Sequence, residues 1–155
     1  MDELAADQQD TKQYLRVNNL IINGIPDLPN IDPYDAVVDL ADFHQVRISK
    51  ANIDIAHRLP NKNRANKQIL VKFVQRWCKE ELRQAQYRRR ERLTTKHLKY
   101  TGPTQFVYIN EHLTPYLQKL HHEAIMLKKT RKIESVQVIN GKIDVKKAKK
   151  YSSLL

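Results

Sequence analysis

Apolar residues along the chain repeat with the periods of strands and helices in turn. The run at residues 20–22, stopped by Asn23-Gly24, predicts a buried strand. Asp32-Pro33 is a helix-start signal, and the apolar spacing that follows predicts a helix ending near Val46. Residues 53–59 alternate with period two and end at Pro60, which predicts a half-buried strand.

The clearest strand signal covers residues 68–74, with Ile69, Val71 and Phe73 expected on one face. An amphipathic helix is predicted directly after this strand. Its apolar positions, expected to be buried, are Trp77, Cys78, Leu82 and Ala85, and its solvent face is expected to carry Arg76, Lys79, Arg83 and Gln86. After the break at Gly102-Pro103, residues 105–109 predict a further strand.

Two more elements are predicted near the end of the chain. Thr114-Pro115 repeats the cap-then-proline signal and begins a helix with apolar positions at Leu117, Leu120, Ala124 and Leu127. Asn140-Gly141 lies between two alternating segments and supplies the two positive-φ positions of a type I′ turn. A β-hairpin therefore closes the predicted fold.

The order strand, helix, strand, strand, helix, strand predicts an α+β domain of split β-α-β topology, with a four-stranded sheet backed by two helices. We assign this domain to residues 18–110. The last helix and the hairpin form a small C-terminal module at residues 111–147. The basic tail at residues 148–155 is expected to be flexible.

Residues 1–17 predict a helical lead-in or the stub of a coiled coil. Leu4, Gln8, Thr11 and Leu15 follow the alternating four- and three-residue spacing of a coiled-coil seam. Half of these positions are polar, so the segment is not expected to hold a coiled coil alone. A homo-oligomer formed through this segment is one possible partner arrangement.

Charge is distributed unevenly along the 155 residues, whose net charge is +11 at pH 7. Residues 1–45 carry nine acidic and two basic side chains, whereas the remaining residues have a net charge of +18. A nucleic-acid partner is therefore expected to contact the second part of the chain. A basic surface that serves only solubility is the alternative.

The densest positive charge lies at residues 75–99, which contain nine Arg or Lys and three Glu. The apolar periodicity stops near Arg88 while the charge continues, and we place the nucleic-acid contacts there. Tyr87 is the aromatic residue best placed to stack on a base, with packing at the helix end as the alternative. The candidate binding residues of this segment are Arg83, Tyr87, Arg88, Arg89, Arg90, Arg92, Lys96 and Lys99.

Two further basic groups complete the candidate set. One surrounds a loop at residues 61–67, and the other ends the helix that begins at Pro115, where cations also suit the helix dipole. The residues are Arg58, Lys62, Arg64 and Lys67 in the first group and Lys128, Lys129 and Arg131 in the second.

Several function classes are not expected. The sequence has no run of about eighteen apolar residues and begins with an acidic segment, so we expect neither a membrane span nor a signal peptide, and a cytosolic or nuclear location. The lone Cys78 excludes an internal disulfide and a multi-cysteine zinc site. Catalytic motifs are absent from the sequence, and the adjacent His121 and His122 point about 100° apart on a helix. No enzyme activity, cofactor or metal is expected.

Five sequence blocks occur in a fixed order before the basic hairpin: NNLIINGIPD, IDIAHRLP, KQILVKFV, RLTTKHL and VYINEHLTP. They resemble the family that contains the C-terminal domain of the baculovirus few-polyhedra (FP) protein, which insect retroelement first-reading-frame proteins share. More remotely, the chain is similar to the RNA-binding protein encoded by the first reading frame of LINE-type retrotransposons. The resemblance covers about residues 13–147, and its most specific blocks are LTTKHL and YINEHLTP.

The resemblance implies a noncanonical RNA-recognition-motif (RRM) fold followed by a small C-terminal domain. Full-length relatives join these to an upstream coiled coil. It also implies that arginines between the two domains grip a single strand, and Arg88, Arg89 and Arg90 match that place. Ordinary RRMs stack bases on aromatics of the two central strands. The matching exposed positions here are expected to be Ile21, Gln68 and Leu70, none of them aromatic.

Binding is therefore expected to depend on charge. The leading hypothesis is sequence-tolerant binding of single-stranded RNA or DNA, with nucleic-acid chaperone activity in a viral or retroelement particle as a further expectation. The alternative is a few-polyhedra-like morphogenesis factor that acts through viral or structural protein partners. No sequence motif decides between RNA, the leading choice, and DNA.

Overall fold

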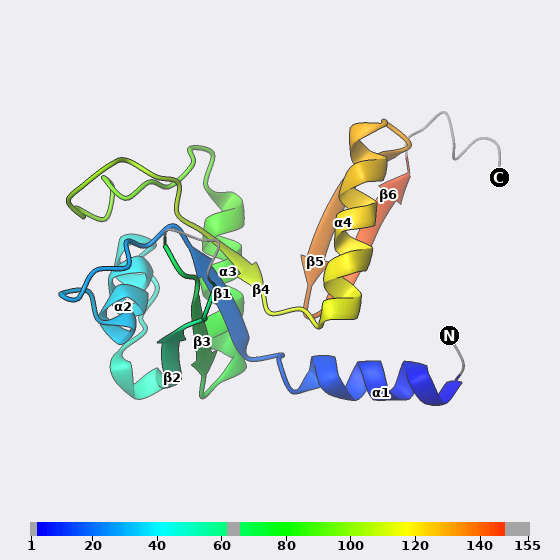
Figure 1. Ribbon diagram of the computed structural model, residues 1–155, viewed down its shortest axis with the longest axis horizontal. Helices are drawn as coiled ribbons and strands as arrows, with labels where there is room; N and C mark the ends of the chain where they lie inside the picture. Colours follow the sequence, from blue (N-terminus) through cyan, green and yellow to red (C-terminus); the bar gives the residue numbers. More distant parts are fainter. Residues whose placement is uncertain (1–2, 62–65, 148–155) are drawn as a thin grey trace. The chain divides into compact units, whose positions relative to one another are not determined.

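The computed structural model describes residues 3–61 and 66–147, with the backbone alone for residues 3–7 (Figure 1). The predicted tail at residues 148–155 lies outside the described residues. The structure mixes helices with antiparallel strands, which confirms the α+β composition. The elements are α1 (Glu3–Tyr14), β1 (Asn19–Asn23), α2 (Pro33–Phe43), a 3₁₀ turn η1 (Lys50–Asn52), β2 (Ile53–Arg58), β3 (Ile69–Phe73), α3 (Arg76–Arg88), β4 (Tyr108–Glu111), α4 (Pro115–Lys129), β5 (Ile133–Ile139) and β6 (Lys142–Lys147).

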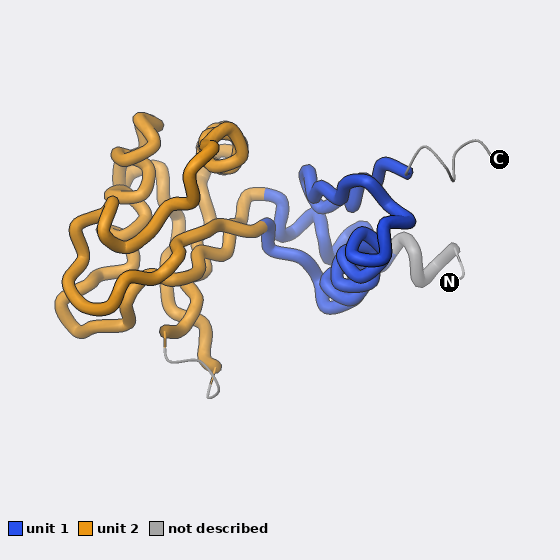
Figure 2. The backbone as a smooth tube through the Cα atoms, turned by 90° about the horizontal axis from the view of Figure 1, so that it is seen from above, with its two compact units in different colours: residues 1–17, 111–155 blue, residues 18–110 orange. Residues whose placement is uncertain are grey.

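The chain forms two compact units (Figure 2). Unit 2 comprises residues 18–110, and unit 1 combines residues 1–17 with residues 111–155. The sequence pattern predicted residues 1–17 as a separate lead-in segment. In the structure α1 instead belongs to the same unit as α4 and the hairpin, an association between segments about 100 residues apart in the chain that local periodicity could not reveal.

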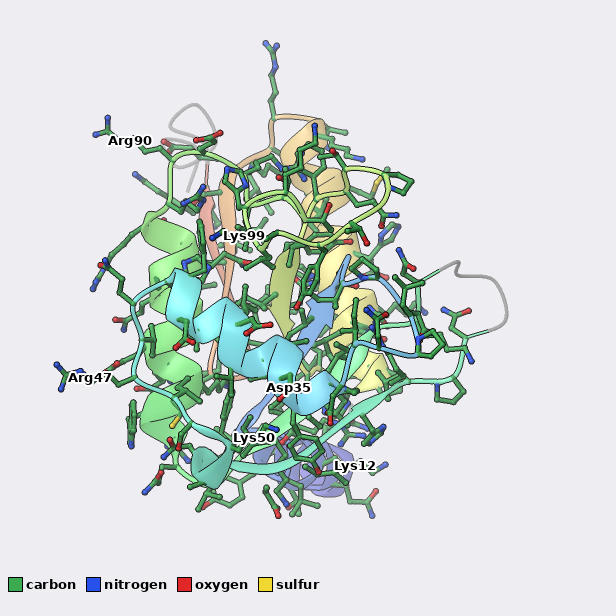
Figure 3. The ribbon with its side chains drawn as sticks, turned by 90° about the vertical axis from the view of Figure 1, so that its left-hand side faces the viewer. Lys12, Asp35, Arg47, Lys50, Arg90 and Lys99 are labelled. Atoms are coloured by element: carbon green, nitrogen blue, oxygen red, sulfur yellow. The ribbon has the colours of Figure 1, made fainter. Side chains whose placement is uncertain are left out.

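Unit 2 is built on a four-stranded sheet with the order β2-β3-β1-β4. Strand β3 runs antiparallel to both β1 and β2, so that Val71 lies opposite Leu20 on one side and Ala56 on the other. These side chains share one sheet face and belong to a buried cluster with Leu40 of α2 and Leu82 of α3. Both helices therefore cover the same face. Figure 3 shows α2 toward the viewer with α3 beside it.

Most helix-start and strand signals of unit 2 are confirmed. Asp32 caps α2, where its Oδ1 accepts a hydrogen bond from Tyr34 N at 2.8 Å. Ile69, Val71 and Phe73 are all buried, as the alternation of β3 predicted. Strand β2 differs from its prediction because a register shift between Ile53 and Ile55 interrupts the period of two.

Helix α3 corrects one prediction. Cys78 and Leu82 are buried as expected, but Trp77 is 40% exposed and Lys79 only 1% exposed. The buried stripe is thus rotated by about one position, and a lysine fills it. The long apolar stem of a lysine packs well against a core when the ammonium group finds a partner. Burial raises the pKa of the Cys78 thiol.

Unit 1 contains the predicted hairpin, in which β5 and β6 pair antiparallel. Asn140 and Gly141 have φ values of 50° and 76°, which confirms a turn with two positive-φ positions. A Cβ atom at Gly141 would lie 2.5 Å from Gln13 Cγ, so the turn also requires glycine for its close approach to α1. Helix α4 begins as predicted, with Thr114 Oγ1 accepting a hydrogen bond from Leu117 N.

Candidate nucleic-acid interface

The basic segment at residues 87–99 begins in the last turn of α3 and is held to unit 2 by hydrogen bonds at its start and in its middle. Before it, the Gln86 side chain pairs with the outer edge of β4: Oε1 accepts from Ile109 N at 2.6 Å, and Nε2 donates to Ile109 O at 2.9 Å. Within it, Leu93 O accepts from Val107 N and Thr95 N donates to Gln105 O, both at 2.9 Å. The loop that carries the arginines therefore projects from a fixed base.

Five cations of this segment are exposed. The first three follow one another on alternate residues at the helix end, and Figure 3 shows the Arg90 side chain pointing away from the ribbon. Within the described residues, none of the five pairs with a carboxylate. They are Arg88, Arg90, Arg92, Lys96 and Lys99.

Arg89 differs from these neighbours because it is half-buried, with its guanidinium over the Phe43 ring of α2, 4.7 Å from the ring centroid. Such a cation–π contact holds a half-buried arginine to the fold. Burial and the nearby Arg89 together lower the pKa of His44, the residue that ends α2. Phe43 also contacts the ring of His97, so the underside of the basic segment packs on the end of α2.

Acidic and basic parts of the sequence therefore meet in unit 2, which the charge profile along the chain did not indicate. Tyr100 Oη donates to Asp39 Oδ2 of α2 at 3.5 Å. Burial, with Asp39 as a second cause, raises the pKa of Tyr100 to about 12. This tyrosine stays neutral and serves as a hydrogen-bond donor between the two segments.

Arg58 does not fit the candidate interface. Its guanidinium donates to the backbone carbonyls of Ile25, Lys67 and Pro26 at 2.8, 2.7 and 2.5 Å, and it lies 3.6 Å from Asp27. Burial lowers the pKa of Arg58. These contacts tie the loop after β1 and the loop before β3 to the end of β2, so we remove Arg58 from the candidate residues and assign it a structural role.

The other candidates are placed as follows. Lys67 is exposed and Arg83 is half-buried on α3, whereas Lys62 and Arg64 lie outside the described residues. Lys128, Lys129 and Arg131 are exposed at the end of α4 in unit 1. The segment that was expected to join the two domains, residues 87–99, belongs entirely to unit 2.

Tyr87 is 70% exposed, so the alternative in which it packs at the helix end is wrong.

The positions predicted to be exposed on the central strands also need correction. Ile21 is only 8% exposed and Leu70 is half-buried, because each lies beside the other across β1 and β3. Gln68 Nε2 donates to Asn23 Oδ1 at 2.7 Å.

Two exposed aromatic residues were not recognised from the sequence. Phe106 is 50% and Tyr108 is 42% exposed, and they alternate with buried Val107 and Ile109. The Arg92 guanidinium stacks on one of these rings: Arg92 Cζ lies 3.8 Å from the Phe106 ring centroid. Aromatic residues at alternate positions of the 105–109 strand signal were the indication that could have identified them.

A cavity of about 190 Å³ opens where the basic segment meets this aromatic pair. It combines aromatic surface, guanidinium groups and one carboxylate. Its lining residues are Gln86, Arg89, Glu91, Arg92, Leu93, Phe106, Val107 and Tyr108.

The part of the chain that the structure describes shows no group of three or more His, Cys, Asp or Glu side chains suited to a metal ion. Of its helices, none combines the length and apolar character that crossing a bilayer requires. No protein-family model and no curated protein matches the sequence.

Proposed function

We propose that this protein binds single-stranded nucleic acid, with RNA as the leading ligand, through the exposed cations of residues 87–99. The observation that carries the proposal is the set of five exposed cations between the end of α3 and Lys99, in a segment that hydrogen bonds at Gln86, Leu93 and Thr95 hold to the fold. Because no described carboxylate neutralises them, they repel one another until a polyanion arrives. Nothing in this arrangement requires a reaction, so the proposal is a binding protein and not an enzyme.

The fold supports this proposal. The sheet order β2-β3-β1-β4 with both helices on one face supports the RRM-like domain that we propose. The central strands β1 and β3 lack the stacking aromatics of ordinary RRMs, which favours binding through phosphate charge. The sequence resemblance to the few-polyhedra and retroelement family also supports nucleic-acid binding. We extend the proposal to nucleic-acid chaperone activity in a viral or retroelement particle.

Salt dependence tests the proposal directly. Each phosphate neutralised on a single strand contributes about 0.7 to the slope of log affinity against log salt. Five engaged cations give a slope of about −3.5. The measurement is fluorescence anisotropy of the full chain with mixed-sequence single-stranded RNA, single-stranded DNA and duplex at several salt concentrations.

The matched variants remove two charges each. Arg88→Ala with Arg90→Ala should reduce the slope by about 1.4 and weaken binding to all sequences about equally. Arg47→Ala with Arg76→Ala is the control, since both residues are exposed. Arg76 begins α3, about 18 Å along the helix from Arg88. Figure 3 shows Arg47 pointing away from the ribbon, apart from Arg90. An equal loss in both double variants, or binding without salt dependence, would contradict the proposal.

A role in particle assembly through protein partners is the second candidate. It is favoured by the exposed apolar surface at the end of α1, where Tyr14 and Leu15 are 68% and 69% exposed. Pull-downs with and without nuclease treatment separate the two candidates. Partners that survive the nuclease favour assembly, whereas partners lost with the nucleic acid favour binding to a strand.

A further inference from the structure

We propose that the cavity beside β4 is a nucleobase pocket in which Phe106 and Tyr108 stack against one base of the bound strand. This inference rests on the proposed function and adds a specific subsite to it. The charge-driven account places phosphates on the arginines but assigns no place to the bases. The cavity lies within the same segment as those arginines and carries the aromatic surface that the central strands lack.

The two rings lie on the same side of the strand. Residues 106–111 alternate between exposed and buried side chains, with Val107 and Ile109 in the core. Side chains two residues apart point to the same face of an extended chain. Phe106 and Tyr108 therefore form a continuous apolar surface facing away from the core.

The backbone under Phe106 is held in place from two sides. Phe106 pairs with Thr94 across an antiparallel bridge. On the other side Gly24, with φ of 92°, lies so close that a Cβ atom there would be within 1.9 Å of Phe106 O. A fixed aromatic platform loses little conformational entropy when a ligand stacks on it.

The Phe106 ring already accepts a flat, delocalised group. The Arg92 guanidinium lies over it at 3.8 Å, and stacking of this kind is also how a base contacts an aromatic ring. A base that enters the pocket takes this face of the ring, and the displaced guanidinium becomes available to a phosphate. Arg88 and Arg90 supply further cations for the flanking phosphates.

The size and lining of the cavity fit one base. Its volume of about 190 Å³ is smaller than the roughly 300–1,000 Å³ of sites that enclose whole drug-sized ligands. Glu91 and Arg92 line it and offer only acceptors and only donors, respectively, to the edge of a base. Because every base has a π-face, stacking keeps the binding sequence-tolerant, with purines favoured by their larger rings.

An abasic strand tests the pocket separately from the charge. The full chain is titrated with a single-stranded oligonucleotide and with an abasic strand of the same length and number of phosphates. We expect the base-bearing strand to bind about 5- to 160-fold more tightly, equivalent to about 1–3 kcal/mol per stacked base. The salt slope should be the same for both strands, because both carry the same phosphates.

The variant Phe106→Leu with Tyr108→Leu keeps apolar bulk and removes both rings. It should bind the base-bearing strand almost as weakly as the abasic strand, with the salt slope unchanged. Trp77→Leu is the control, since this aromatic side chain of α3 is 40% exposed and does not line the cavity. Tyr87→Ala tests the other candidate for base stacking. Circular dichroism melting establishes that each variant is folded, and Phe106→Leu alone serves if the double variant is not.

The outcomes separate the two proposals. Wild-type protein that binds both strands equally, with salt dependence, overturns the pocket and leaves the charge-driven function standing. A loss in Tyr87→Ala equal to that of the double variant also overturns the pocket and assigns stacking to Tyr87. Failure to bind either strand overturns the proposed function itself.

Discussion

The two units of this protein are stabilised in different ways. Unit 2 surrounds a cluster of nineteen buried apolar residues shared by its sheet and two helices. Among the described side chains of unit 1, Leu113 and Ala124 are the only buried hydrophobic ones. Unit 1 instead buries Gln13, Glu111 and Thr114.

These buried polar groups of unit 1 bind the backbone. The Glu111 carboxylate accepts from Asn140 N at 2.7 Å and from Gly141 N at 2.5 Å. Gln13 Nε2 donates to His112 O, and Gln13 Oε1 accepts from Thr114 N, both at 3.0 Å. Burial and the nearby Arg16 lower the pKa of His112 to about 4, so its ring is neutral at pH 7. A small unit with few apolar residues is thus held together by side chains that satisfy turns and helix ends.

The basic clusters of the two units differ in a related way. Lys128 and Lys129 occupy the last turn of α4, where cations stabilise the helix through its dipole. Arg90 and Arg92 lie beyond the end of α3, next to a cavity with two aromatic side chains. Stabilisation of the helix explains why Lys128 and Lys129 are basic, but it does not explain Arg90 and Arg92, which lie outside a helix. We therefore place the binding of the nucleic-acid strand on unit 2.

The largest effect is expected from the glycine that underlies Phe106. Gly24→Ala brings a Cβ atom within 1.9 Å of Phe106 O, so the backbone at residues 106–107 must shift. We expect unit 2 to lose about 3 kcal/mol or more, from the positive φ and the backbone clash together. Thermal unfolding measured by circular dichroism checks this.

Gly102→Ala is the matched control for that prediction. Gly102 also has a positive φ, 102°, but no atom lies within 4 Å of the place that a Cβ atom would take there. The substitution should cost only about 1–2 kcal/mol, from the backbone conformation. Equal destabilisation by the two substitutions would show that the contact with Phe106 contributes nothing.

An intermediate effect is expected in unit 1. Glu111→Gln keeps the shape of the side chain but replaces one acceptor oxygen by a donor, so one of the two turn N–H groups loses its partner. We expect about 1.5–3 kcal/mol less stability in unit 1, the range for hydrogen bonds to a charged group. Amide hydrogen exchange at β5 and β6 measures it, and unchanged exchange in β1 and β3 is the internal control.

The smallest effect should follow removal of the unit 1 cations. Lys128→Ala, Lys129→Ala and Arg131→Ala together should weaken strand binding less than the Arg88 and Arg90 pair does, at about threefold or below. This result would mean that removing the three charges of unit 1 reduces affinity less than removing the two charges of Arg88 and Arg90 beside the pocket. Anisotropy titration at one fixed salt concentration compares them, and a larger loss in the triple variant would move the interface to unit 1.

The elements of the fold could be predicted from local signals. Asp32 and Thr114 are helix caps, Asn140-Gly141 is the hairpin turn, and the alternation of β3 is as expected. These features depend on the conformational preferences of neighbouring residues, which sequence carries directly. The buried face of α3 was predicted less well, since Lys79 rather than Trp77 is buried and only the packed neighbours decide this.

By itself, the sequence determined the order of the elements, the basic character of residues 87–99 and the absence of aromatics from the base-stacking positions expected on the central strands. Only the tertiary structure decided that Arg58 and Arg89 are half-buried against other parts of the fold, whereas Arg88, Arg90 and Arg92 are exposed. It also decided that Phe106 and Tyr108 adjoin the arginines in one cavity. The physical reason is that charge and periodicity are local properties, whereas exposure and partners depend on contacts between residues far apart in the chain.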